Sequence, residues 1–125
     1  MSIELKEIIE KAWDNKVLLE KRTTRKAIES VIDMLDKGQI RVAEPTDQGW
    51  ILNEWVKKAV LMYFPIKESK VMKVGPFEFN DKIDLKSGYK ELGVRVVPQA
   101  IARYGSYIAK GVIMMPSFVN IGAYV

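Results

Sequence analysis

The C-terminal end of the chain spaces its apolar residues in a way that fits neither a helix nor an ordinary alternating strand. A large apolar residue followed by a small or apolar one recurs at intervals of seven, six and seven residues. The pairs are Ile101-Ala102, Ile108-Ala109, Met114-Met115 and Ile121-Gly122. This pattern is typical of a parallel β-helix, in which each short strand turns one apolar side chain inward and a small residue permits the corner. Two ordinary strands joined by a turn at 115–117 are the alternative.

The chain contains no histidine and no cysteine. Within these 125 residues this excludes a Ser-His-Asp or Cys-His catalytic group, a His-ligated zinc site and a disulfide framework. Glu78, Asp81 and Asp84 form a loose acidic cluster, but their spacing fits no loop template for a hard cation. We therefore expect these acids to be solvated and predict no metal site.

Composition and charge indicate one folded domain. Hydrophobic residues make up 48% and charged residues 29% of the chain, which is typical of a soluble globular protein. The net charge is +4, but the basic residues are scattered between acids. Nucleic-acid binding requires a clustered basic face, so we expect no such partner. The acidic N-terminus does not resemble a secretion signal and no stretch approaches the length of a membrane span. We expect a cytoplasmic protein that does not bind membranes.

Three stretches place apolar residues on one face of a helix. The first ends near Asn15. The second begins at an N-cap of Thr23 or Thr24 and stops at Gly38, and the third lies between Asn53 as cap and Pro65. The apolar positions are Leu5, Ile8, Ile9, Ala12 and Trp13 in the first, Ile28, Val31, Ile32 and Leu35 in the second, and Trp55, Val56, Ala59, Val60, Met62 and Tyr63 in the third.

Between the second and third helices the period changes to two, which predicts a β-hairpin near 39–52 with its turn at 45–49. Trp50 and Trp55 are candidates for a ligand-stacking pair, but aromatic residues at regular spacing more often belong to the core, which is the role we expect. Residues 66–92 contain several turn signals, and we expect loops that join one or two short strands around 71–74.

Several motifs resemble one enzyme family, the tetrahydrodipicolinate N-succinyltransferases. Residues 93–98 (Gly-Val-Arg-Val-Val-Pro) and 114–125 (Met-Met-Pro-Ser-Phe-Val-Asn-Ile-Gly-Ala-Tyr-Val) are similar to the start of that family's β-helix. Upstream, the tryptophan at 50 and the segments 24–27, 32–38, 41–44 and 55–61 are similar to its N-terminal helices and hairpin. The resemblance spans almost the whole chain except 71–92.

This resemblance implies an α+β fold with a small helical N-terminal domain over 1–92, containing the hairpin near 39–52. Residues 93–125 are then expected to form the first coil of a left-handed parallel β-helix of hexapeptide repeats. The family's enzymes transfer succinyl from succinyl-CoA to tetrahydrodipicolinate on the diaminopimelate route to lysine, and are similar in forming homotrimers. The resemblance thus implies succinyl-CoA as co-substrate, a dicarboxylate acceptor and no permanently bound cofactor.

One functional residue follows from the resemblance. The arginine of the family's Gly-x-Arg-Val-Val-Pro stretch contacts the acceptor, and it corresponds to Arg95. A guanidinium suits this role because it can hold a carboxylate through two parallel hydrogen bonds. The alternative is that Arg95 simply alternates outward between Val94 and Val96. We assign no catalytic residue within the chain and identify no residue that binds CoA.

The chain encodes little more than one turn of such a β-helix, and its edge would be uncapped. We therefore expect an N-terminal part of the enzyme, truncated within the β-helix and inactive by itself. Two alternatives remain open. One is a non-catalytic interaction or oligomerisation module whose C-terminal strands add to a partner's sheet, and the other is a related transferase that uses another acyl-CoA.

Overall fold

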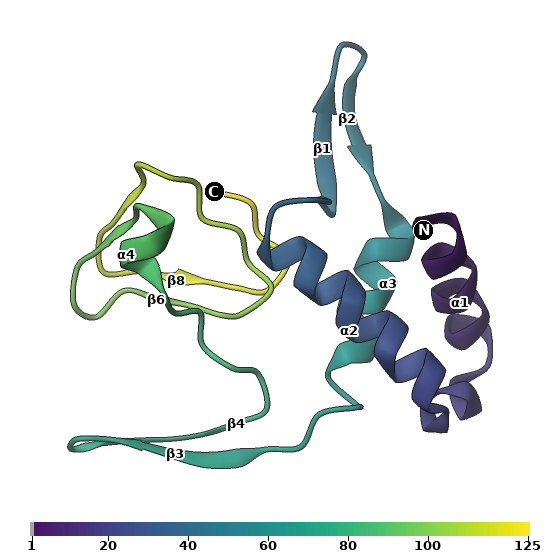
Figure 1. The fold of residues 1–125 in the computed structure, drawn as a ribbon, viewed down its shortest axis with the longest axis horizontal. Helices are drawn as coiled ribbons and strands as arrows, with labels where there is room; N and C mark the ends of the chain where they lie inside the picture. Colours follow the sequence, from purple (N-terminus) through teal and green to yellow (C-terminus); the bar gives the residue numbers. More distant parts are fainter. Residues whose placement is uncertain (1) are drawn as a thin grey trace.

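The computed structural model describes residues 2–125, with side chains from Ile3 onward. It is an α+β structure in which the three longer α-helices occupy one side, the C-terminal strands and one short helix occupy the other, and two hairpins extend from the body (Figure 1). The helices are α1 (Ser2–Asp14), a 3-10 turn (Lys16–Glu20), α2 (Arg22–Asp36), α3 (Glu54–Tyr63) and α4 (Tyr89–Leu92). The strands are β1 (Ala43–Thr46), β2 (Gly49–Leu52), β3 (Lys70–Val74), β4 (Phe77–Asp81), β5 (Arg95–Val96), β6 (Ile101–Ala102), β7 (Ile113–Met114) and β8 (Phe118–Val119).

The main core lies between α1, α2 and α3, and it confirms the three helical patterns. Each helix contributes the apolar stripe expected from its spacing, and burying an aliphatic side chain of this kind contributes about 1.5–3 kcal/mol. Trp55 packs against this core as predicted. The buried residues are Ile9, Ala12, Ile28, Val31, Ile32, Leu35, Val56, Ala59, Met62 and Tyr63, joined by Ile83 and Ile121.

The sequence predicted where α2 ends but not where it begins. The helix begins at Arg22, ahead of the expected cap, because Thr24 lies on the buried stripe and is only 4% exposed. The stop at Gly38 is confirmed. Gly38 adopts a φ of +73°, its N–H donates to Leu35 O and the Gln39 N–H donates to Met34 O. This pair of bonds is the Schellman motif that favours glycine.

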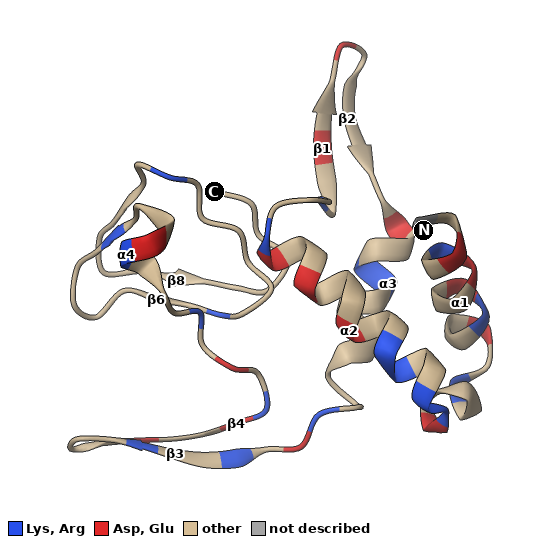
Figure 2. Ribbon diagram, viewed as in Figure 1, with Lys and Arg blue, Asp and Glu red and all other residues tan. Residues whose placement is uncertain are grey.

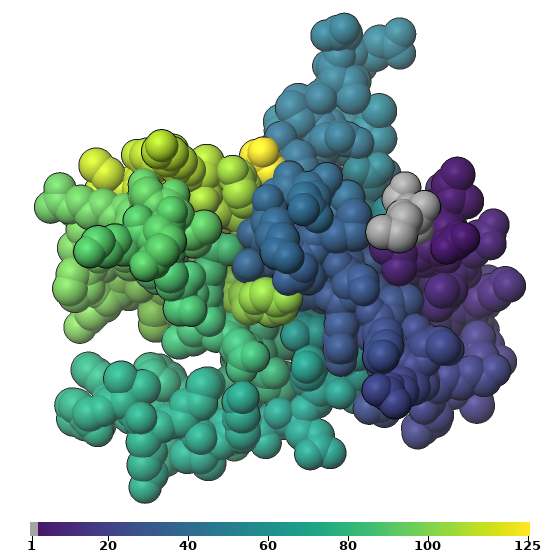
Figure 3. Space-filling view, viewed as in Figure 1, coloured from purple at the N-terminus to yellow at the C-terminus, as the bar shows by residue number. Residues whose placement is uncertain are grey.

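The first hairpin, β1–β2, is confirmed but begins later than expected. Pro45 pairs with Trp50 and Thr46 with Gly49, so Asp47 and Gln48 form the turn. The prediction that Trp50 belongs to the core is wrong. Its side chain is 71% exposed, because the hairpin projects beyond the helices (Figure 3). Strand alternation gives a residue's face, but not whether anything covers that face.

The second hairpin, β3–β4, confirms the short strand expected around 71–74 and adds a partner strand over 77–81. Val74 pairs with Phe77 across a turn at Gly75 and Pro76. The three acids of the loose cluster each pair with a base, Glu78 with Lys73 at 3.9 Å, Asp81 with Arg103 at 3.0 Å and Asp84 with Lys70 at 3.1 Å.

The C-terminal segment pairs its strands in parallel. Arg95 pairs with Ile113 and Val96 with Met114, while Ile101 pairs with Phe118 and Ala102 with Val119. A further parallel bridge joins Tyr107 to Tyr124. Two strands joined by a turn at 115–117 are therefore the wrong alternative, because β7 and β8 pair with earlier strands and not with each other.

A second, smaller core lies inside this C-terminal segment, formed by Val94, Ala102, Ile108 and Met114. The C-terminal segment also packs against the helices through Ile121, which belongs to the main core. No helix in residues 2–125 is long and apolar enough to cross a membrane.

Candidate functional site

Arg95 lies on the outer surface of the parallel-paired segment. Its neighbours Val94 and Val96 face the small core, so the arginine side chain is exposed. The backbone around it is held at two points, since the Arg95 N–H donates to Val112 O at 3.1 Å and the Val97 N–H donates to Met114 O at 2.9 Å. The guanidinium is thus presented to solvent from a fixed strand.

A tight turn follows the arginine strand directly. The Ala100 N–H donates to Val97 O at 2.8 Å, Pro98 occupies the second position and Gln99 the third, with a φ of +104°. This is the pattern of a type II turn, whose third position favours glycine. Sequence reasoning missed the turn, although a proline directly after a strand is a signal for it.

The other end of the arginine strand is defined by Gly93, which ends α4 with a φ of +72°. The side chain of Lys110 lies directly over this glycine. A Cβ at position 93 would lie 2.8 Å from Lys110 Cγ and 3.6 Å from Cδ and Cε. Lys110 is exposed, so its aliphatic stem crosses Gly93 at the surface, two residues before Arg95.

The electrostatic character of this surface is positive. Residues 93–125 contain three basic residues, Arg95, Arg103 and Lys110, and no Asp or Glu. Figure 2 accordingly shows blue positions and no red ones on the coiled segment that follows α4. Arg103 is paired with Asp81. Within the part of the chain whose side chains are described, Arg95 and Lys110 have no carboxylate within 4.0 Å. This surface can bind an anion.

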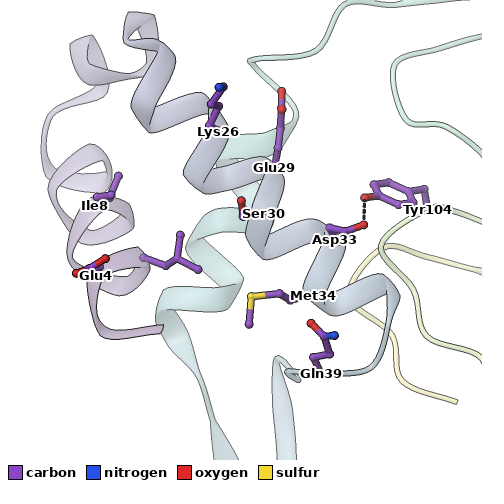
Figure 4. Close-up of a pocket in the computed structure, with 10 residues that line it drawn as sticks. Glu4, Ile8, Lys26, Glu29, Ser30, Asp33, Met34, Gln39 and Tyr104 are labelled. Carbon is purple, nitrogen blue, oxygen red and sulfur yellow. Dashed lines mark hydrogen bonds between the residues drawn. The ribbon is translucent and has the colours of Figure 1, made fainter. Parts of the chain in front are cut away.

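The structure has a separate cavity of about 700 Å³ between α1, α2 and Tyr104 (Figure 4). Its described lining combines apolar side chains with charged side chains of both signs and does not include Arg95. The lining residues are Glu4, Leu5, Ile8, Lys26, Glu29, Ser30, Asp33, Met34, Gln39 and Tyr104.

The polar groups at one end of this cavity bind each other. The Tyr104 hydroxyl donates to Asp33 Oδ1 at 2.9 Å, and Lys37 Nζ lies 2.6 Å from Asp33 Oδ2. The hydrogen bond from Lys37 lowers the pKa of Asp33, and the bond from Tyr104 acts in the same direction. Burial, followed by the hydrogen bond to Asp33, raises the pKa of Tyr104 strongly. Tyr104 therefore remains a protonated donor, and this contact joins the helices to the C-terminal segment.

Taken together, these features define an α+β protein in which a helical bundle precedes parallel-paired strands that carry an exposed cationic surface. The sequence matches the family described as "Tetrahydrodipicolinate N-succinyltransferase N-terminal" over residues 4–66. The chain belongs to this family, and the resemblance seen in its motifs is confirmed.

Similar curated proteins agree with this assignment. The 2,3,4,5-tetrahydropyridine-2,6-dicarboxylate N-succinyltransferase of Paraburkholderia phymatum is 46% identical, over 100% of this chain and 50% of the relative. The proteins of the same name from Bordetella pertussis and Acinetobacter baylyi are 47% and 46% identical, each over 98% of this chain and 48% of the relative. The chain thus spans about half the length of the curated relatives it matches.

Proposed function

We propose that this chain forms the N-terminal half of an enzyme that transfers the succinyl group of succinyl-CoA to tetrahydrodipicolinate on the diaminopimelate route to lysine. The observation that carries the proposal is the identity of 46% over the whole chain to a protein with that activity in its name. The co-substrate is then succinyl-CoA and the acceptor a cyclic dicarboxylate.

The proposed organisation has a helical domain over 1–92 and the first coil of a left-handed parallel β-helix of hexapeptide repeats over 93–125. The parallel pairing of β5 with β7 and of β6 with β8 supports a coil, because consecutive strands of one coil stack on those of the next. The complete protein is proposed to be a cytoplasmic homotrimer. Exposed apolar residues on both hairpins, including Trp50 and Phe77, are consistent with subunit contacts.

In the proposed reaction, the role of Arg95 is to hold a carboxylate of the acceptor. The exposed position of its guanidinium on a hydrogen-bonded strand supports this role, because the group can form two parallel bonds without moving the backbone. Such binding orients the acceptor so that its nitrogen faces the thioester carbonyl of the donor. Water adds across the C=N bond of the cyclic imine, which places a hydrogen on the ring nitrogen. The nitrogen then attacks the thioester carbonyl, the CoA thiolate leaves, the nitrogen loses its proton, and the ring opens to the 6-oxo product. The groups that bind CoA and accept the nitrogen's proton are proposed to lie outside residues 1–125.

The test is an assay of the complete protein that contains this chain, with succinyl-CoA and tetrahydrodipicolinate, following CoA release and the mass of the product. The expected result is N-succinyl-2-amino-6-oxopimelate formed in equal amount to free CoA. Acetyl-CoA is the control donor. Transfer from acetyl-CoA at equal or higher kcat/KM would contradict the assignment of succinyl-CoA as donor. An absence of transfer from both donors would contradict the proposal that the complete protein is an acyltransferase.

A further inference from the structure

We propose that Lys110 is a second anion-binding residue, which together with Arg95 holds both carboxylates of the acceptor. This inference rests on the proposed function for the identity of the acceptor. The pairing of the strands supports it first. Arg95 pairs with Ile113, and the Gly111 N–H donates to Gly93 O at 2.9 Å. Gly93 therefore lies two residues before Arg95, just ahead of β5, and is bonded to the residue that follows Lys110, just ahead of β7.

The path of the lysine side chain is the second step. Its stem, from Cγ to Cε, lies against Gly93. A residue with a Cβ at position 93 would occupy that space, since 2.8 Å is shorter than any normal contact between carbons. Because Gly93 has no side chain, the Lys110 stem lies against the backbone two residues before Arg95. A lysine stem packed in this way keeps its ammonium group at the surface.

The charge distribution is the third step. The 93–125 segment has no acid of its own, and its remaining basic residue, Arg103, bonds to Asp81 Oδ2 and Asn120 Oδ1. Arg95 and Lys110 have no such partner among the described side chains. Both cations thus lack an internal counter-charge, which an external dianion can supply to the two of them.

The two residues suit different parts of a dicarboxylate. A guanidinium donates two hydrogen bonds to one carboxylate in a fixed, planar geometry. An ammonium group on a flexible stem can reach a second carboxylate whose position varies. The arrangement therefore predicts preference for a ligand with two carboxylates over one with a single carboxylate. Dipicolinate, a stable aromatic dicarboxylate, and picolinate, its monocarboxylate counterpart, are suitable probes.

The first experiment titrates each probe into the chain and follows backbone amide shifts of residues 93–97 and 110–114. We expect wild type to bind dipicolinate about tenfold more tightly than picolinate, as one additional charge-assisted contact requires. Lys110→Met keeps the stem over Gly93 and removes the charge, so it should abolish the preference. Lys110→Arg should retain it. Lys6→Met, on the exposed side of α1, is the matched control and should change neither affinity.

The second experiment measures steady-state kinetics of the complete protein. Lys110→Met should raise the KM for tetrahydrodipicolinate about tenfold and leave the KM for succinyl-CoA within twofold. If wild type catalyses no transfer, the proposed function fails, and the titration alone decides the role of Lys110. Equal affinity of wild type for both probes, or an unchanged preference in Lys110→Met, would overturn the inference.

Discussion

Lys86 and Asp36 form an ion pair between segments far apart in the sequence, with Lys86 Nζ 2.7 Å from Asp36 Oδ1. The lysine side chain is only 4% exposed and the aspartate 19%. The same ammonium donates to the Asp36 carbonyl at 3.1 Å, and the Gly105 N–H donates to Asp36 Oδ1 at 2.9 Å. The end of α2 is thus bonded both to the segment before α4 and to the C-terminal segment.

Removing one member of this pair should be costly. We expect Lys86→Met to lower the free energy of unfolding by about 3–5 kcal/mol, because Asp36 would remain partly buried without its counter-charge. The double variant Lys86→Met with Asp36→Asn should recover part of that loss. Urea denaturation followed by circular dichroism measures both. The exposed Lys73–Glu78 pair is the control, and Lys73→Met should cost less than about 1 kcal/mol. Equal effects at the two pairs would contradict the role of burial.

The contact between Asp33 and Tyr104 predicts a pH dependence of stability. The pKa of Asp33 is lowered in the folded protein, first by the bond from Lys37. A lowered folded-state pKa contributes stability above the unfolded value, about 3.9, and that stability is lost as pH falls through the folded pKa. Asp33→Asn should therefore be destabilising at neutral pH, and its effect should shrink as pH falls through the lowered folded-state pKa of Asp33. An effect that grows on acidification would contradict the assignment.

Gly38 should not tolerate a side chain. Its φ is +73°, and an added Cβ would lie 2.6 Å from Tyr107 Cδ1. We expect Gly38→Ala to cost roughly 2–4 kcal/mol, from backbone strain plus displacement of the ring. Gly75→Ala is the matched control, since Gly75 also has a positive φ but meets no atom within 4 Å. Its cost should be about 1 kcal/mol. Thermal unfolding of both variants separates the cost of backbone strain, which both share, from the cost of the clash with Tyr107, which only Gly38→Ala has.

Gln99→Gly should stabilise the protein. Gln99 has a φ of +104° at the third position of its turn, where glycine carries no steric penalty. The expected gain in the free energy of unfolding is about 0.5–1 kcal/mol, since relief of strain is partly offset by the greater flexibility of glycine in the unfolded chain. Gln39→Gly is the control, because Gln39 has no positive φ. Measured by urea denaturation, it should give no increase in the free energy of unfolding.

Arg95→Lys in the complete protein should weaken the acceptor much more than the donor. A lysine keeps the charge but cannot form two parallel bonds to one carboxylate, so we expect about a tenfold increase in the acceptor's Kd. Calorimetry with each substrate measures the two affinities separately. Unchanged acceptor binding would show that Arg95 only alternates outward on its strand.

Local patterns were sufficient for much of this fold. Periodicity located α1, α2 and α3 because each helix buries one stripe, and Gly38 marked a stop because its backbone conformation is one that glycine favours. The strand predicted around 71–74 is present as β3, but its pairing with β4 was not predicted, because most residues of both strands are exposed and burial imposes no clear alternation on them. Trp50 was misplaced for a related reason, since β2 is exposed along its whole length.

The sequence by itself determined the family, the apolar stripes, the hairpin near 39–52 and Arg95 as the residue that the family motif indicates for acceptor binding. Only the tertiary structure decided which charges are paired and which remain available. Asp36 and Lys86 meet because the segment before α4 packs against the end of α2, and Lys110 reaches Gly93 because two short strands pair in parallel register. Such contacts join residues far apart in the chain, so they depend on how elements pack and not on local spacing.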